Sequence, residues 1–138
     1  MSVRRIDHLV FAVRDLAQAA EAWARVLGLR AEASYRPAGA HLDLARLMLE
    51  ADGAFLELAQ PATADHRLAR FIEERGEGMF SISLQVDDLD AAVAEFRGKG
   101  LDVSAPEPGP WPGTRLARIP RAKAHGVAVQ LIERAPAR

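Results

Sequence analysis

Four polar side chains occupy matching positions in a chain that repeats itself. His8 and Glu57 lie in apolar, strand-like segments of the first half. An imidazole and a carboxylate together can ligate a metal or transfer a proton. Ser81 follows His8 by 73 residues, and Gln130 follows Glu57 by the same 73. This spacing gives the neutral hydroxyl and amide a functional meaning that neither would have alone.

The same interval relates the segments around these side chains and indicates an internal duplication. Ile6 to Leu29 follows the same plan as Met79 to Leu101. The matched positions are Val13 with Val86, Asp15 with Asp88, Leu16 with Leu89, Ala19 with Ala92, and Trp23 with Phe96. Phe55 to Leu58 also matches Ala128 to Leu131 without a gap. A fixed period held across distant anchors predicts two copies of one structural unit.

The first unit is predicted to span about residues 4–60 in the order β-α-β-β-β. Alternating apolar residues predict a strand, buried on both faces, at Arg5 to Val13. Asp15 is a suitable N-cap for a helix that begins at Leu16 and ends at Gly28. The remaining strands are predicted at Leu29 to Arg36, His41 to Glu50 and Ala54 to Ala59, with a hairpin turn at Asp52 and Gly53.

The second unit is predicted to span about residues 78–134, after a linker helix over about 64–75. It repeats the plan with a strand at Phe80 to Val86 and a helix from Asp88 to about Lys99. Its other strands are predicted at Leu101 to Val103, Thr114 to Ile119 and Val127 to Glu133. The expected fold is a single α+β domain over residues 1–138. Its two units are expected to share one concave, sheet-lined cavity, where a ligand would bind.

Composition narrows the classes of function. The 138 residues are 49% hydrophobic, which is enough for a core, and the net charge of −1 gives no reason to expect nucleic-acid or membrane partners. The absence of cysteine excludes disulfides and thiolate nucleophiles. No apolar run reaches about 18 residues, so no transmembrane helix is expected. Without a signal peptide in the sequence, a cytoplasmic location is expected.

Several segments resemble the vicinal oxygen chelate superfamily, which includes glyoxalase I, bleomycin-resistance proteins, extradiol dioxygenases and methylmalonyl-CoA epimerase. They are IDHLVFAV and VLGL in the first half, LARFIEERGEGM before the second, VDDLDAAVAEF within it and GVAVQLIE at its end. Their order and spacing cover nearly the whole chain and are most similar to the epimerase-like branch. The resemblance implies a glyoxalase-like fold.

The resemblance also implies a site. Enzymes of this superfamily usually hold a divalent metal (Co, Mn, Mg, Zn or Ni) with four side chains, whose positions here are His8, Glu57, Ser81 and Gln130. In the epimerases the third is a histidine and the fourth a glutamate that is also thought to act as a base. We therefore predict weak metal ligation by His8, Glu57 and Gln130, and Glu57 as the catalytic residue. Ser81 and Gln130 are also predicted to contact substrate.

Two classes of function remain open at this stage. One is an isomerase or lyase that acts beside the carbonyl of a small acyl or carbonyl compound, including a coenzyme A thioester. The other is a metal-free protein that binds or sequesters a small molecule; a module kept only for dimerisation is a third alternative. His8 and Glu57 can form a general base without metal, and His8 can equally be a hydrogen-bonded core histidine. An extradiol dioxygenase is disfavoured because its second histidine is missing.

Other residues are candidates for the mouth of the cavity. Trp111 lies in a proline-rich loop that can cover a ligand or simply pin the loop, and His125 precedes the last strand. Positive charge near this mouth can attract a carboxylate or phosphates, or can simply belong to a solvated strand face; it is supplied by Arg115, Arg118, Arg121 and Lys123. Open sheet edges and the family resemblance predict a homodimer.

Overall fold

A computed structural model describes residues 3–49 and 53–135 of the chain. It divides them into two compact units, one of residues 8–80 and one of residues 81–135 together with 3–7. We call these the N-terminal unit and the C-terminal unit. No helix in the described ranges is long and apolar enough to cross a membrane.

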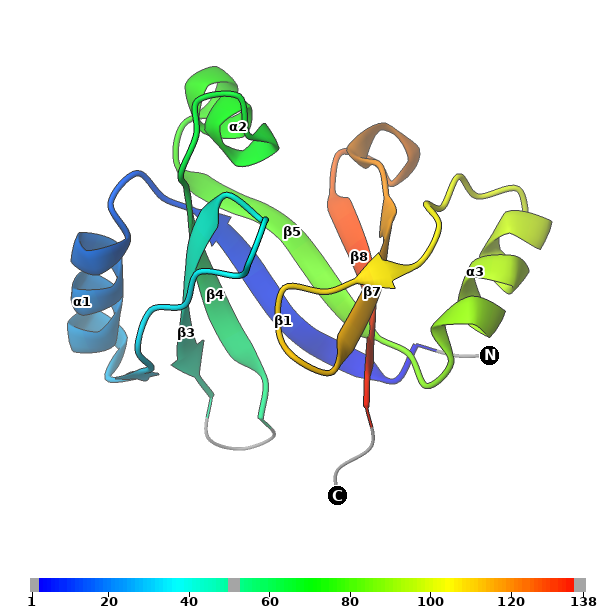
Figure 1. Cartoon of the computed structure of the whole chain (residues 1–138), viewed down its shortest axis with the longest axis horizontal. Helices are drawn as coiled ribbons and strands as arrows, with labels where there is room; N and C mark the ends of the chain where they lie inside the picture. The colour runs from blue at the N-terminus through cyan, green and yellow to red at the C-terminus, as the bar shows by residue number, and fades with distance from the viewer. Residues whose placement is uncertain (1–2, 50–52, 136–138) are drawn as a thin grey trace. The chain divides into compact units, whose positions relative to one another are not determined.

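The N-terminal unit contains a four-stranded sheet in the order β2-β3-β4-β1. Its strands are β1 (Arg5–Ala12, whose first three residues belong to the C-terminal unit), β2 (Arg30–Ala31), β3 (Leu42–Met48) and β4 (Phe55–Pro61). β1 runs parallel to β4, and the other neighbours are antiparallel. The helix α1 (Leu16–Leu27) packs on β3 and β4, and α2 (Arg67–Arg75) contacts β4 (Figure 1).

The first helix forms where the sequence predicts it. The Asp15 carboxylate accepts a hydrogen bond from the Gln18 amide at 3.0 Å, which is an N-cap contact. Gly28 ends the helix at φ +69°, a left-handed conformation that glycine adopts without steric cost. The apolar stripe of α1 packs on Leu47 and Leu58 of the sheet, so one face of β3 and β4 is covered by this helix.

The C-terminal unit repeats this architecture with strand order β5-β8-β7-β6. Its strands are β5 (Gly78–Gln85, of which residues from Ser81 belong to this unit), β6 (Glu107–Pro108), β7 (Thr114–Ile119) and β8 (Ala128–Arg134). β5 and β8 are parallel. The helix α3 (Leu89–Gly98) packs on β7 and β8, and the short 3₁₀ turn η1 (Arg121–Lys123) precedes β8 (Figure 1). Asp88 caps α3 as Asp15 caps α1, which confirms the matched helix starts.

Three predicted elements differ from the structure. The strand expected over 29–36 is reduced to β2 and a single bridge between Tyr35 and Leu44. The strand expected over 101–103 does not form, because both Nε and Nη2 of Arg97 donate to the Val103 carbonyl, at 3.0 and 2.9 Å. β6 forms later, inside the proline-rich loop. The expected hairpin residue Asp52 lies outside the described residues.

The third difference concerns α2, which begins at Arg67 rather than at residue 64 because His66 is its N-cap. The Nδ1 atom of His66 accepts a hydrogen bond from the Leu68 amide at 3.0 Å, so this nitrogen must be unprotonated. Burial, and then the positive charge of Arg67, lower the pKa of His66 below its ordinary value.

The cap therefore makes stability depend on pH. A folded pKa below the unfolded value means that the unfolded chain binds the proton more readily. The resulting stability is complete above about pH 6.5, the ordinary histidine pKa, and is lost as pH falls through the lowered value. His66→Asn, which keeps a capping oxygen, should reduce the loss between pH 7.5 and 5.5 by up to about 1 kcal/mol, as measured by urea unfolding. An equal loss in the variant would exclude His66 as its source.

Candidate functional site

The structure places His8 and Glu57 together inside the N-terminal unit. His8 lies on β1 and Glu57 on the parallel strand β4, two positions beyond Phe55, which is the register partner of His8. His8 is 3% exposed and Glu57 is 4% exposed. The His8 Nε2 and Glu57 Oε2 atoms are 3.9 Å apart, within ion-pair range but longer than a hydrogen bond. The pair lies on the sheet face opposite α1, because side chains alternate along a strand.

Phe55 and Arg46 surround this pair. The His8 imidazole stacks on the Phe55 ring at a centroid distance of 4.5 Å and an angle of 7° between the planes. The Arg46 guanidinium lies 5.2 Å from the centre of the same ring, and it also pairs with Glu32 at 3.0 Å. Arg46 is the register partner of Glu57 on β3. The imidazole orientation is thus fixed by packing, which suits a group that assists proton transfer.

The donor set does not fit a tightly held divalent metal. His8 and Glu57 are close enough to contact one ion, but divalent ions of this kind take four to six donors. Within residues 3–49 and 53–135, no three His, Cys, Asp or Glu side chains are arranged to hold a metal. The Gln130 amide oxygen, a third predicted ligand, already accepts a hydrogen bond from Ser83. We therefore derive no chemistry through a metal.

The two other predicted positions, Ser81 and Gln130, lie in the C-terminal unit. Ser81 is 1% exposed on β5, and its hydroxyl makes no hydrogen bond to any described group. Ser83 is fully buried and donates from Oγ to the Gln130 Oε1 atom on β8 at 3.1 Å. Sequence reasoning missed Ser83, although its position two residues after Ser81 on the same strand face was a usable signal.

The candidates for the cavity mouth differ in their surroundings. Trp111 is half-buried, and its carbonyl accepts from the Thr114 hydroxyl at 2.5 Å, which is a turn contact. His125 is exposed, with a left-handed φ of 56°. Arg115 bonds to Asp90 on α3, whereas Arg118 pairs with Glu107 from the opposite face of β7. The predicted positive charge is therefore divided between two faces and partly neutralised.

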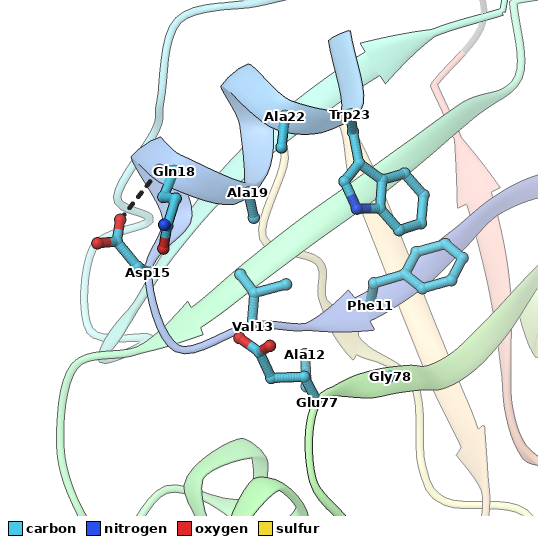
Figure 2. A pocket seen from close by; sticks show the side chains of 10 residues that line it. All are labelled: Phe11, Ala12, Val13, Asp15, Gln18, Ala19, Ala22, Trp23, Glu77 and Gly78. Atoms are coloured by element: carbon cyan, nitrogen blue, oxygen red, sulfur yellow. Dashed lines mark hydrogen bonds between the residues drawn. The ribbon is translucent and has the colours of Figure 1, made fainter. Parts of the chain in front are cut away.

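A hollow of about 390 Å³ in the N-terminal unit lies on the α1 side of the sheet. Figure 2 shows its aromatic wall, where the rings of Phe11 and Trp23 are 4.8 Å apart. Asp15 and Glu77 contribute carboxylates, which accept hydrogen bonds from the backbone amides of Gln18 in the first turn of α1 and of Arg14 just before the helix. None of the predicted site residues lines this hollow, so it is separate from the His8–Glu57 pair.

Comparison with known proteins agrees with this architecture. A sequence model of the glyoxalase/bleomycin resistance protein/dioxygenase superfamily matches residues 7–117. The chain belongs to this superfamily. Its α+β fold is glyoxalase-like, as the sequence predicted.

Several relatives of this superfamily member are methylmalonyl-CoA epimerases. The human mitochondrial epimerase is 28% identical over 98 residues, which cover 70% of this chain but only 54% of the human protein. The crystal structure of the Mycobacterium tuberculosis epimerase superposes with a TM-score of 0.89 at 28% identity, over 97% of this chain and 90% of that one. A Streptomyces coelicolor epimerase variant in complex with 2-nitronate-propionyl-CoA gives the same TM-score and identity, over 98% and 100%.

Proposed function

We propose that this superfamily member binds a small acyl thioester of coenzyme A and transfers a proton at the carbon beside the thioester carbonyl. The observation that carries the proposal is the buried pair of His8 and Glu57, a carboxylate and an imidazole held side by side without a tight metal site. The epimerase relatives support the class of ligand, since one of them is in complex with an acyl-CoA analogue. A carbon acid activated by a carbonyl is the substrate for which a fixed carboxylate base is useful.

In the proposed step, Glu57 accepts the proton from the α-carbon. The C–H electron pair moves into the C–C bond, and the thioester carbonyl oxygen becomes an enolate. Glu57 then returns the proton, or a proton exchanged with water, to the same carbon. His8 orients the carboxylate and is itself fixed by the stacked Phe55 ring. With one base, return of the proton to the same face of the same carbon gives hydrogen exchange alone. A one-base isomerase would deliver the proton to another carbon, and a lyase would use the enolate electrons to expel a leaving group. Two-base epimerisation would need a second proton donor or acceptor on the other face.

The repeat and the family resemblance support substrate contacts in addition to the base. Ser81 and Gln130 stand at the positions that correspond to His8 and Glu57, and we include them as groups that contact the acyl moiety. Trp111 and His125 remain proposals for the mouth of the site. A homodimer is also proposed, and light scattering of the purified protein would measure it.

The proposal predicts deuterium uptake by an acyl-CoA substrate. Protein purified without added metal and kept in chelator is incubated in D₂O with methylmalonyl-CoA, propionyl-CoA and malonyl-CoA. Mass spectrometry should show replacement of an α-hydrogen in at least one of them, at a rate proportional to protein concentration. Protein-bound metal is measured on the same sample, and the exchange should persist well below one ion per chain. Exchange that appears only on addition of Co²⁺ or Mn²⁺ would overturn the metal-free mechanism.

The alternative function is a metal-free binding protein that sequesters a small molecule. The neutral side chains of Ser81 and Gln130 favour it, because two of the four positions that the repeat and the family resemblance identify then lack an ionisable group. Binding of an acyl-CoA with a raised melting temperature, but without deuterium uptake, would support this alternative over the enzyme.

A further inference from the structure

The Ser81 hydroxyl is the clearest sign of a missing partner in the C-terminal unit. Its side chain is almost completely buried on β5, yet it has no hydrogen-bond partner among the described groups. Buried polar groups are nearly always satisfied, so each exception needs an explanation. An alanine would fill the same position without leaving a hydroxyl unpaired, and a serine here is explained if a ligand oxygen completes the bond.

Ser83 fixes the direction of the neighbouring Gln130 amide. Ser83 and Gln130 are register partners on parallel strands, and the Ser83 hydroxyl donates to the Gln130 Oε1 atom at 3.1 Å. With its oxygen engaged, the amide presents its NH₂ group as the donor. Ser81 and Ser83 lie on one face of β5, since residues two apart point the same way. This face is opposite α3, whose core contacts are made by Leu84 and Leu131.

The charges around these residues indicate what they can bind. Ser81, Ser83 and Gln130 are neutral, and the residue beside Gln130 in register on β7 is Arg118, a cation that pairs with Glu107. Neutral N–H and O–H donors bond most strongly to an oxygen that carries negative charge. A planar group with two oxygens can accept one hydrogen bond at each oxygen. Examples are a carboxylate, a nitronate, and the enolate oxygen of a thioester together with an oxygen next to it.

We infer that Ser81 and Gln130 form a hydrogen-bonding pair for an anionic acyl oxygen, with Ser83 as the residue that positions the Gln130 amide. This inference rests on the proposed acyl-CoA binding and specifies how the acyl group is recognised. It assigns Gln130 the role of hydrogen-bond donor through its NH₂ group, in contrast to the predicted role of metal ligand through its oxygen. Donors preorganised in a buried site bind a developing oxyanion more tightly than its neutral precursor.

The test compares two ligands that differ in the acyl oxygen. Calorimetry in chelator measures binding of 2-nitronate-propionyl-CoA, which carries an anionic nitronate, and of coenzyme A, which carries no acyl group. Wild type should prefer the nitronate at least about tenfold. Ser81→Ala and Ser83→Ala should each weaken nitronate binding roughly three- to tenfold, and Gln130→Glu more, because a carboxylate repels the anion. Affinity for coenzyme A should stay within about twofold in all three variants.

Stability of the unliganded protein provides an independent readout. Ser81→Ala should keep or raise the melting temperature, because the hydroxyl that it removes has no partner; a marked fall would mean a structural role and overturn the inference. If Ser83→Ala lowers nitronate and coenzyme A affinity equally, the positioning role is wrong. If nitronate binding is unchanged in Ser81→Ala, the inference is overturned but the proposed function is not. Failure of wild type to bind either compound overturns the proposed function and the inference with it.

Discussion

Replacing Glu57 with glutamine is expected to lower the rate of α-proton exchange at least about 100-fold while acyl-CoA affinity changes less than about threefold. Glutamine has the size of glutamate but cannot accept the proton, and a positioned general base contributes roughly 10²–10⁴ in rate. Deuterium uptake measured by mass spectrometry gives the rate, and calorimetry gives the affinity. Because the Glu57 side chain is almost fully buried, the melting temperature of the variant must be measured together with its rate and affinity.

The matched control is Glu73→Gln, which makes the same chemical change on an exposed residue of α2 and should leave the exchange rate unaltered. His8→Asn should give an intermediate loss, since it removes the orienting imidazole but leaves the carboxylate. Two results would contradict the assignment. Undiminished exchange in Glu57→Gln would move the base elsewhere, and a joint collapse of affinity and melting temperature would make the pair structural.

The second large effect is expected on stability, at the ion pair of Asp7 and Arg134 in the C-terminal unit. The guanidinium donates two bonds to the carboxylate, at 2.7 and 2.8 Å, and joins residues 127 positions apart in the chain. Asp7 is 2% exposed, whereas the Arg134 side chain is 31% exposed. Arg134→Gln should therefore lower the free energy of unfolding by about 3–5 kcal/mol, because it removes the guanidinium from a buried carboxylate.

The difference in burial makes the two partners unequal. Asp7→Asn should cost less than Arg134→Gln, because Arg134 retains contact with water when its charge partner is neutralised. The comparison pair is Arg4 and Asp87, which lie 3.5 Å apart with both side chains about 60% exposed. Arg4→Gln should change the free energy of unfolding by less than about 1 kcal/mol. Urea unfolding measures all three, and equal costs for Arg4→Gln and Arg134→Gln would refute the argument from burial.

Local signals in the sequence were sufficient for the starts of α1 and α3 and for the longer strands, but not for the strands expected over 29–36 and 101–103. The helix starts at Leu16 and Leu89 are confirmed, because an aspartate cap and an apolar stripe act over a few residues. The strand over Thr114–Ile119 is confirmed to the residue. The offset of 73 residues also led to His8 and Glu57, whose proximity follows from neighbouring parallel strands once the repeat is recognised.

Other features depend on contacts between residues that are distant in the chain, and only the tertiary structure decided them. The sequence cannot show that Arg97 binds the Val103 carbonyl, or that Ser83 turns the Gln130 amide, since each depends on the geometry of a side chain and its partner. It also placed Arg115 and Arg118 in one positive cluster, although strand alternation directs them to opposite faces. Periodicity therefore determined the framework and the positions of the polar residues. The orientation of each polar group, including the Gln130 amide whose oxygen accepts from the Ser83 hydroxyl, was determined by packing.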